Sequence, residues 1–469
     1  MTDHTHCGRW VLLDPPCGQG YARRASLREK ADAPEAPFPS IDLILLSGAV
    51  REAGFTPVYL DAQIRLWGWP RLIQEMRAIR PKGVISLLSS ARIDEEMAQL
   101  RVLKESLAAA VYVVGSIHLV LDSLRVRQLM EAHDWLSGVV LNTAENNFSQ
   151  VIAGGNAAPH NVALRRDNGI HAPEASATYG EGLHMPMPQH AIFKDRRYFF
   201  PQSKRKPVTC TQMSFGCPYR CEFCLDNALY RKMRYRRTDD VVAELEEIDR
   251  LGFREVYFKD LTFGLNKRIT AEVLERLSGP RLRLRWLCTT RVDVATPRLL
   301  RLMKNAGCYG IEFGVESGLR HRRAANGKPI DDDEIRTVFH NCRRLGIETT
   351  AFVMIGFEDE TEAEIRTTIE FITSLRADYA SYNVVNALPG TPLAERAREE
   401  GFLRVDETDH TFHRSNLLHK HLTPDRLEAL RAGAVRSFYR RPSTALLRLW
   451  RMKSFFELAK LVRLSRAAI

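Results

Sequence analysis

Cysteine is scarce in this chain of 469 residues, which has nine in all and only Cys7 and Cys17 ahead of Cys210. Long apolar runs are scarce too. The longest uncharged one, residues 107–121, is interrupted by polar residues and is shorter than the ~20 residues that a bilayer-spanning helix needs. The N-terminus also lacks the basic region and apolar stretch of a secretory leader. We therefore expect no membrane-spanning helix and a cytoplasmic protein with reduced thiols.

Basic charge is plentiful but unevenly placed. The formal net charge is +11, and residues 420–469 alone hold twelve basic and three acidic side chains. Residues 440–469 mix Trp450, Phe455 and several leucines with these basic residues at helical spacing. Such a helix either lies in a membrane interface, as a peripheral contact at the inner membrane surface, or packs on the protein. Nucleic-acid binding is disfavoured, because no stacking platform accompanies the charge.

Apolar runs alternate with helix-like segments through the first third of the chain. The runs are "RWVLLDPP" (9–16), "PVYLDA" (57–62), "GVISLLSS" (83–90), "AVYVVGS" (110–116) and "SGVVLNT" (137–143). Continuous apolar strands between helices are typical of a parallel sheet covered on both faces. The pattern predicts a doubly wound, Rossmann-like α/β domain over residues 1–155. Residues 156–206 are rich in Gly, Pro, His and Asn and indicate a surface linker.

A second alternation of strands and helices begins at Pro207. Six strands are expected, at residues 207–215, 255–260, 282–290, 309–315, 347–356 and 379–387. Glycines mark the ends of four of the intervening helices: Gly252, Gly279, Gly307 and Gly346. Six repeats are too few for an eightfold barrel. The pattern therefore indicates a partial (β/α)6 TIM barrel over residues 207–405, followed by a small basic helical C-terminal region over residues 406–469.

Three cysteines lie within eight residues in "SFGCPYRCEFC", residues 214–224, at spacings C-x3-C-x2-C. A structural zinc site is tetrahedral and needs a fourth Cys or His, and none follows at the usual spacing. A disulfide conflicts with reduced thiols. An iron–sulfur cubane held by three thiolates keeps its fourth iron open for another ligand. Zinc and a disulfide stay as alternatives to an iron–sulfur cluster.

This cysteine loop resembles that of the radical S-adenosylmethionine (SAM) superfamily, including Phe223 at the aromatic position before the last cysteine. The resemblance implies that Cys217, Cys221 and Cys224 bind a 4Fe–4S cluster. It also implies that the open iron chelates SAM, and that reductive cleavage of SAM yields a 5′-deoxyadenosyl radical. In such enzymes the cofactors carry the chemistry and the protein orients them.

Further similarities to the superfamily follow the expected strands, at the barrel end where active residues lie. "GVESG" is similar to the family's "GxESG", "MIGFEDET" stands in place of "GLPGET", and "NALPGTPL" contains the "PGTPL" of one large branch. "FKDLTF" departs from the usual Gly-Gly-Glu stretch. The residues that the resemblance assigns to SAM binding are Phe223, Asp260, Arg291, Glu316, Ser317 and Gly356. Arg291 in particular is expected to meet a carboxylate bidentately.

The N-terminal segment resembles the cobalamin-binding domain that precedes the barrel in one radical SAM branch. "DPPCGQG", "GVISLLSS" and "YVVGSIH" agree with that domain's strand ends, and "LNTAEN" agrees only loosely. Since ligands of doubly wound sheets bind at the carboxyl edge, the resemblance places cobalamin against Gly18, Ser89, Ser90, Gly115, His118 and Glu145. No D-x-H-x-x-G is present to supply a lower histidine ligand. A degenerate domain kept for packing is the alternative.

The resemblance implies a cobalamin-dependent radical SAM enzyme that methylates an unactivated carbon. Its small-molecule substrate is expected to be apolar or lipidic, and its electron donor a flavodoxin or ferredoxin. A cobalamin-assisted cyclase or rearrangement enzyme of tetrapyrrole or lipid biosynthesis is one alternative. A tRNA methylthiotransferase is another, although that class uses three further N-terminal cysteines and only Cys7 and Cys17 exist here. A non-catalytic carrier or sensor of the cluster and cobalamin is the third.

Overall fold

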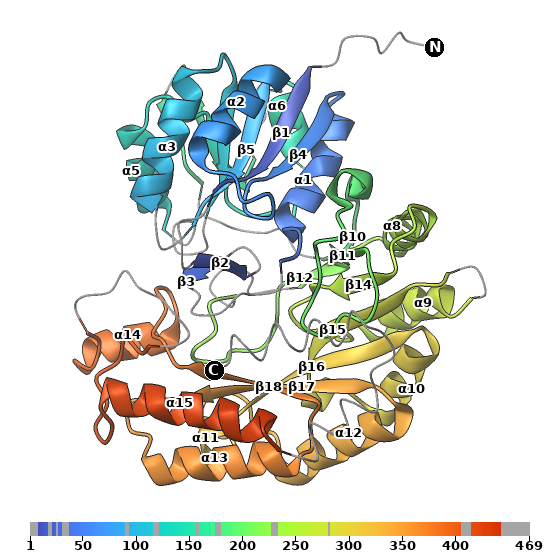
Figure 1. The fold of residues 1–469 in the computed structure, drawn as a ribbon, viewed down its shortest axis with the longest axis vertical. Coiled ribbons are helices and arrows are strands. Elements are labelled where there is room, and N and C mark those ends of the chain that lie inside the picture. Colours follow the sequence, from blue (N-terminus) through green and yellow to red (C-terminus); the bar gives the residue numbers. More distant parts are fainter. Residues whose placement is uncertain are drawn as a thin grey trace. The chain divides into compact units, whose positions relative to one another are not determined.

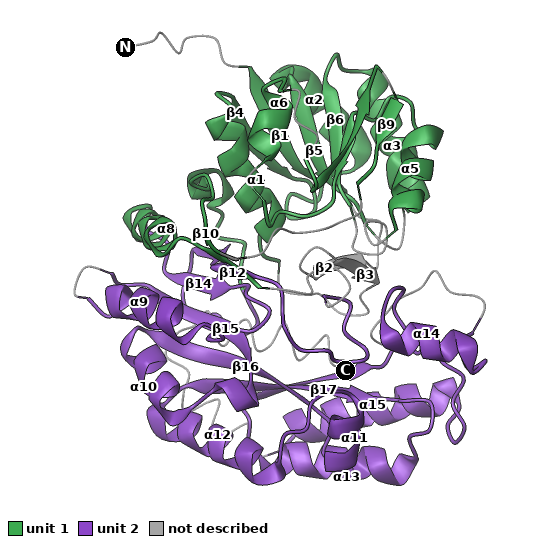
Figure 2. Cartoon of the chain, turned by 180° about the vertical axis from the view of Figure 1, so that it is seen from behind, with its two compact units in different colours: residues 1–199, 232–251 green, residues 200–231, 252–469 purple. Residues whose placement is uncertain are grey.

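The chain forms two compact units, coloured separately in Figure 2. Unit 1 comprises residues 1–199 and 232–251, and unit 2 comprises residues 200–231 and 252–469. The chain thus begins in unit 1, passes into unit 2 at residue 200, returns to unit 1 for residues 232–251 and ends in unit 2. The computed structural model describes residues 8–16, 21–24, 27–30, 37–89, 93–115, 122–145, 147–155, 159–167, 169–173, 180–226, 233–279, 282–404 and 414–441.

Unit 1 is built on a seven-stranded sheet in which five strands run parallel (Figure 1). These strands are β1 (Arg9–Asp14), β4 (Thr56–Asp61), β5 (Gly83–Leu87), β6 (Ala110–Val114) and β7 (Gly138–Val140). Their order in the sheet, β4-β1-β5-β6-β7, is that of a common doubly wound fold. All five positions of β5 are buried, as expected for a strand that is covered on both faces.

Helices follow the strands of unit 1. They are α1 (Ile41–Glu52), α2 (Trp69–Ile79), α3 (Ile93–Glu105), α5 (Ser123–Ala132) and α6 (Phe148–Ile152). α1 packs against α6 and is buried along most of its length. α2 instead buries only Leu72 and Met76, one turn apart, and turns its charged residues to solvent. A short antiparallel hairpin, β2 (Tyr21–Arg24) and β3 (Leu27–Lys30), follows β1.

Residues 156–206 contain more structure than the linker that the composition predicts. β8 (Val162–Arg166) and β9 (Gly169–His171) add two antiparallel strands to the edge of the sheet. β10 (Gly180–Leu183) and the 3₁₀ helix η1 (His190–Phe193) follow. Val162, Ala163 and Leu164 are buried, so a short apolar segment among polar residues is enough to extend the sheet. The sheet of unit 1 is therefore mixed rather than wholly parallel.

The helix expected over "DDVVAELEEIDRLG" is present as α8 (Thr238–Arg250), but it belongs to unit 1. Glu244 on α8 is fully buried, accepts a hydrogen bond from His190 at 2.9 Å and forms an ion pair with Arg236 on β13 (Arg234–Arg236) at 2.6 Å. A buried carboxylate needs such partners. The contacts therefore hold α8 to η1 and β13, and the units divide the chain differently from the boundaries expected at residues 155 and 207.

Unit 2 contains a six-stranded parallel sheet whose strands follow one another in chain order (Figure 1). They are β11 (Val208–Thr211), β14 (Glu255–Phe258), β15 (Arg285–Arg291), β16 (Cys308–Glu316), β17 (Glu348–Ile355) and β18 (Tyr379–Val384). Each lies within one of the six predicted strand segments or overlaps it. Among the described strands β11 and β18 are the edges, so the sheet is open, as expected for six repeats rather than eight.

Several helices of unit 2 begin and end at residues that are typical of helix caps. The helices of this unit are α9 (Lys267–Leu277), α10 (Pro297–Asn305), α11 (Arg320–Ala325), α12 (Asp332–Leu345), α13 (Glu362–Ser374), α14 (Pro392–Glu399) and α15 (Pro424–Tyr439). Asp331 with Glu334 and Thr361 with Glu364 form capping boxes at α12 and α13. Gly346 ends α12 in the left-handed conformation, φ 64°.

The two faces of the six-stranded sheet differ in chemistry. On one face, the rings of Phe258, Phe263 and Trp286 lie 5.2–5.3 Å apart and are fully buried. On the other, Glu312 of β16 accepts hydrogen bonds from Tyr257 of β14, from Thr289 of β15 at 3.1 Å and from Gln202 at 2.7 Å. Burial raises the pKa of both Glu312 and Tyr257. The apolar face forms the core, and the polar network lies on the opposite face.

Candidate functional site

The three cysteines lie on the loop that follows β12 (Ser214–Phe215). Cys217, Cys221 and Cys224 are half-buried, and all three are free thiols. Gly216 has φ 91°, and the N–H of Cys224 donates to the carbonyl of Cys221 at 3.0 Å, so the loop is tightly curled. The other described cysteines (Cys210, Cys288, Cys308 and Cys342) are buried and free. The structure thus contains no disulfide among its described residues.

The donor set can be compared with what different metal centres require. Within the described part of the chain, no three His, Cys, Asp or Glu side chains gather as a single metal ion would need. A cubane has another requirement, because each thiolate binds a different iron. Three free thiols on one curled loop can each supply a ligand to a different iron once deprotonated, so the residues present fit an iron–sulfur cluster.

Arg291, at the end of β15, lies beside this loop. Its guanidinium is 3.5 Å from the centre of the Tyr219 ring, and its Nη1 lies 3.8 Å from the sulfur of Cys221. Nε and Nη2 both donate to Asp293, at 2.9 and 2.8 Å. The bidentate face expected to meet a ligand carboxylate is therefore occupied by Asp293, which leaves Nη1 as the nitrogen that faces the sulfur of Cys221.

A second cation, Lys328, belongs to the same group. Its Nζ donates to Oε1 of Glu316 at 2.8 Å, and both side chains are nearly buried. They occupy the space above Gly314, where an ideal Cβ would lie 2.3 Å from the Glu316 oxygen and 2.5 Å from Nζ. Glu316 itself has φ 68°, a conformation that a non-glycine residue rarely adopts. The end of β16 is thus shaped around this ion pair.

The loop that carries Lys328 touches the cysteine loop directly. Gly327 has φ 72°, and a Cβ there would lie 2.6 Å from the carbonyl oxygen of Arg220. Burial raises the pKa of the Cys221 thiol, while Lys328 and Arg291 oppose this rise. The two cations would therefore stabilise a thiolate at this position.

Asp260, at the end of β14, is buried and turned toward the start of the cysteine loop. It accepts hydrogen bonds from the hydroxyl of Ser214 and from the N–H of Met213 at 3.2 Å. Burial raises its pKa to about 6, against the opposing effect of these hydrogen bonds. Thr262, two residues further on, has its hydroxyl 3.6 Å from the sulfur of Cys217. Asp260 thus anchors the chain that leads to the cysteines.

Two of the residues assigned to SAM binding are engaged elsewhere. The hydroxyl of Ser317 is fully buried, lies 3.2 Å from that of Thr368 on α13 and accepts from the N–H of Leu319 at 3.1 Å. Gly356, with φ 85°, is backed by α15, since a Cβ there would lie 2.5 Å from Leu427. The structure therefore explains why Gly356 is glycine without any ligand, and Ser317 does not join the group around Cys221.

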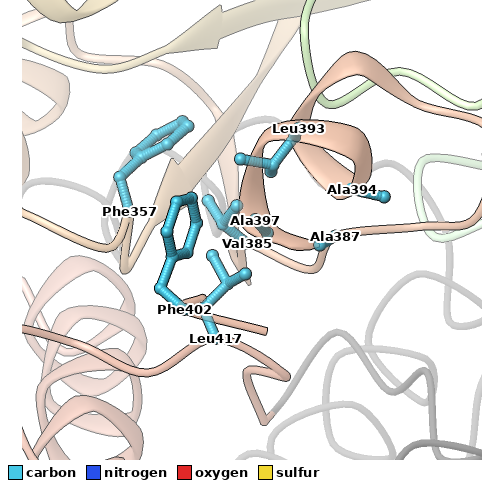
Figure 3. Close-up of a cluster of buried hydrophobic side chains, with 8 residues drawn as sticks. All are labelled: Phe357, Val385, Ala387, Leu393, Ala394, Ala397, Phe402 and Leu417. Carbon is cyan, nitrogen blue, oxygen red and sulfur yellow. The ribbon is translucent and has the colours of Figure 1, made fainter. Parts of the chain in front are cut away.

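Phe223 packs against an apolar cluster instead of standing free. Figure 3 shows this cluster, which gathers side chains from the loop after β17, from the segment after β18, from α14 and from the residues beyond α14: Phe357, Val385, Ala387, Leu393, Ala394, Ala397, Phe402 and Leu417. Phe223 and Met354 lie at its border. The aromatic residue of the cysteine motif thus anchors its loop to the body of unit 2.

Three of the residues assigned to cobalamin lie at one edge of the sheet in unit 1. Ser89, Gly115 and Glu145 follow β5, β6 and β7, which are neighbours in the sheet. The N–H of Ser89 donates to Glu96 at 2.7 Å. Glu145 accepts from Arg234 at 3.1 Å and from Asn147 at 2.8 Å. Gly18, Ser90 and His118 lie outside the described residues, as does the basic segment 442–469.

Lys328, Tyr219, Thr262 and Gly327 are members of the site that sequence reasoning missed. Lys328 and Gly327 lie in "AANGKPI", where Gly and Pro indicate an ordinary turn. Of the four, only Tyr219 could have been linked to the site from the sequence, because it lies inside the cysteine motif. The others reach the cysteine loop through the fold, so no spacing in the sequence connects them.

Comparison with known families identifies the region that surrounds these cysteines. A family model for the radical SAM superfamily matches residues 211–372. Residues 211–372 are a radical SAM domain. The resemblance seen in the cysteine loop is thereby confirmed, and the match includes the strand ends that carry Arg291, Glu316 and Gly356.

Curated relatives match different shares of the chain. The hopanoid C-2 methylase of Rhodopseudomonas palustris is 30% identical over 228 residues, 46% of this chain and 42% of that protein. The anaerobic magnesium-protoporphyrin IX monomethyl ester cyclase of Cereibacter sphaeroides is 24% identical over 377 residues, 77% of this chain and 61% of that protein. The matches therefore span less than two thirds of either relative.

A solved structure of similar fold covers nearly the whole chain. It is the radical SAM methyltransferase TsrM from Kitasatospora setae, solved with cobalamin and a 4Fe–4S cluster bound. The TM-score is 0.67, the identity 16%, and the match covers 98% of this chain and 99% of that one. At this identity the likeness shows the fold alone, an α/β fold.

Proposed function

We propose that this chain is a radical SAM enzyme whose Cys217, Cys221 and Cys224 hold a 4Fe–4S cluster. The observation that carries the proposal is the environment of Cys221. Its half-buried thiol faces two cations, Arg291 and Lys328, on a loop with two further free thiols. Burial raises the pKa of the Cys221 thiol, as Glu316 does, whereas Lys328 and Arg291 oppose this rise and so favour the thiolate form.

The chain's own residues would hold and orient the cofactors. When bound, the cluster and SAM supply a 5′-deoxyadenosyl radical that removes a hydrogen atom from a substrate carbon. Asp260 fixes the start of the cysteine loop through Ser214 and Met213. Of the residues assigned to SAM, Arg291 and Glu316 lie beside Cys221 or its neighbours and are the ones we propose to contact it, while Phe223, Ser317 and Gly356 shape the surrounding loops.

We further propose that cobalamin binds at the carboxyl edge of the sheet in unit 1 and supplies a methyl group. Ser89, Gly115 and Glu145 lie at that edge, and Gly18, Ser90 and His118 are assigned to it by resemblance. C-methylation of an apolar or lipidic small molecule is the proposed reaction. The relationship to a hopanoid C-2 methylase supports this substrate class.

A cyclase is the second candidate, and one observation favours it. The match to the magnesium-protoporphyrin cyclase covers 77% of this chain, whereas the match to the hopanoid methylase covers 46%. Resemblance to the cyclase therefore extends over more of the chain. On this alternative the substrate would be a tetrapyrrole.

An external reductant of the flavodoxin or ferredoxin type is part of the proposal, since the cluster must be reduced for each turnover. Contact with a membrane surface stays a prediction based on the basic C-terminal segment. No helix in the described residues is long and apolar enough to cross a bilayer.

The test is anaerobic reconstitution with iron, sulfide and hydroxocobalamin, followed by gel filtration. We expect about four irons per chain, a retained corrinoid and, after reduction with SAM present, 5′-deoxyadenosine. A reconstituted protein that holds the cluster but forms no 5′-deoxyadenosine would support a carrier instead. Methyl transfer from labelled SAM to an added hopanoid or tetrapyrrole would then separate the methylase from the cyclase.

A further inference from the structure

The "PGTPL" motif, residues 389–393, is not explained by the proposed function, although the sequence singles it out. It forms the start of α14. Thr391 caps the helix by accepting from the N–H of Ala394 at 3.2 Å and donates its hydroxyl to the carbonyl of Leu388 at 2.6 Å. Pro392 occupies the first turn, where its missing N–H costs nothing. The motif therefore builds a rigid helix start.

This helix start contacts the cysteine loop through the backbone. The first N–H groups of a helix have no partner within the helix. Here the N–H of Leu393 donates to the carbonyl of Glu222 at 3.1 Å. Glu222 lies between Cys221 and Cys224, so the helix holds the segment that joins two of the three cysteines.

One turn further along α14, Arg396 contacts the same segment through its side chain. Nε donates to Oε1 of Glu222 at 2.7 Å, and Nη1 donates to Oε1 of Glu358 at 2.5 Å. Burial opposes the charge of Arg396, but the hydrogen bonds to Glu358 and Glu222 outweigh it and raise its pKa. Glu358 lies in the loop after β17, so Arg396 links the cysteine loop to two separate parts of unit 2.

Apolar packing acts on the same loop as well. Phe223, the residue after Glu222, borders the cluster of Figure 3, in which Leu393 and Ala397 of α14 are buried. The guanidinium of Arg396 also lies 5.1 Å from the ring of Phe402, another member of the cluster. A backbone hydrogen bond and one ion pair on Glu222, and an apolar contact on Phe223, thus converge on the segment between the last two cysteines.

We propose that α14 is the support of the cysteine loop and that Arg396 is its positioning residue. The inference rests on the proposed function, since it concerns the cluster that the loop would hold. Arg396 does not touch the cysteines itself. It fixes Glu222, and through Glu222 the spacing of Cys221 and Cys224, as outer hydrogen bonds orient metal ligands in other proteins.

The experiment compares Arg396→Met with Arg426→Met in the reconstituted full chain. Arg426 provides a matched control, because it donates from Nε and Nη2 to Glu362 at 2.7 and 2.6 Å on α15 and α13 and does not touch the cysteine loop. Cluster loss is followed by the decay of the visible absorbance under an iron chelator. We expect loss at least about 10-fold faster in Arg396→Met, in line with other outer-shell changes, and wild-type behaviour in Arg426→Met.

Two further readouts separate positioning from general stability. The electron paramagnetic resonance spectrum of the reduced cluster is expected to change in Arg396→Met and to stay as in wild type in Arg426→Met. The melting temperature of the cluster-free protein is expected to fall in Arg396→Met, because Glu358 and Glu222 lose their cation, so the spectrum is the readout that a merely structural role would not move. Arg396→Lys keeps the charge but loses the second nitrogen that lets arginine bind two carboxylates at once. Its rate of cluster loss is expected to lie between those of wild type and Arg396→Met.

The double variant Glu222→Gln/Arg396→Met tests the route through Glu222. If Arg396 acts through that carboxylate, the double variant loses the cluster no faster than Arg396→Met alone. Equal cluster loss in Arg396→Met and Arg426→Met would overturn the inference. Should Arg396→Met fail to fold, Glu222→Gln alone must still accelerate cluster loss, or the inference fails. A wild-type chain that takes up no cluster would contradict the proposed function instead.

Discussion

The two units place functional candidates at the same structural position, the carboxyl ends of neighbouring parallel strands, but the side chains at the two positions differ in chemistry. In unit 2, charged side chains surround Cys221, and Arg291, Lys328, Glu316 and Asp293 pair with one another. In unit 1 the described candidates are a serine, a glycine and a carboxylate that already has partners. The candidate site of unit 2 is thus built on ion pairs, whereas that of unit 1 offers backbone, small side chains and one paired carboxylate.

The largest effect is expected from Cys221→Ala, which removes one of three thiolates. Because no other described cysteine is exposed near the loop, we expect the cluster to be lost and 5′-deoxyadenosine to fall more than about 100-fold. Iron content and product formation are measured together. Cys342→Ala is the control, since that thiol is buried on α12, and it should keep the cluster. Retention of both cluster and activity in Cys221→Ala would defeat the cysteine assignment.

Lys328→Met tests whether the ion pair between Lys328 and Glu316 stabilises the candidate site of unit 2. The substitution leaves the Glu316 carboxylate buried without its cation, which is expected to lower the free energy of unfolding by about 3 kcal/mol. Urea denaturation of the cluster-free protein measures this. The double variant Lys328→Met/Glu316→Gln should recover much of the loss, because no charge is then left unpaired. A loss below about 0.5 kcal/mol, as at an exposed pair, would show that the pair is solvated.

Glu360 gives unit 2 a pH dependence. Burial raises its pKa from 4.5 to about 7, although the N–H groups of Gly356 and Phe357 donate to it and oppose the rise. The folded state therefore holds a proton that the unfolded state releases between these pH values. Stability is thus expected to fall as the pH rises from 4.5 to 7, by at most roughly 3 kcal/mol.

Glu360→Gln removes this titration and keeps an oxygen that can accept from the same two N–H groups. The difference in unfolding free energy between variant and wild type should therefore change steadily across pH 4.5 to 7, with the wild type relatively more stable at the acid end. Thermal unfolding at a series of pH values measures it. If this difference in unfolding free energy stayed constant from pH 4.5 to 7, the pKa of Glu360 would not be raised in the folded state.

The sequence allowed the six strands of unit 2 and the three cysteines to be predicted, because apolar periodicity and a fixed spacing are local features. Lys328 and Arg396 could not be predicted in the same way. Each lies in a segment that reads as an exposed turn or helix, and each reaches the cysteine loop only after residues more than a hundred positions apart have folded together. The sequence singled out Asp260 as a site residue, but not its partners Ser214 and Met213. A place at the end of a strand does not tell which way the side chain points.

Glu145→Gln has the smallest expected effect and tests the other side of the comparison. Both oxygens of Glu145 accept hydrogen bonds from the chain itself, from Arg234 and Asn147, so the carboxylate is occupied without a cofactor. Gln keeps an acceptor of similar shape, and the side chain of Arg234 is 19% exposed, unlike that of Lys328 at 4%, so water can reach it. We therefore expect stability to fall by no more than about 1 kcal/mol and corrinoid retention to change less than about threefold. Gel filtration after reconstitution with hydroxocobalamin measures retention. Complete loss of the corrinoid would instead make Glu145 a direct ligand. Cofactor binding in unit 1 would then depend on a charged side chain, as we propose for the cluster site of unit 2.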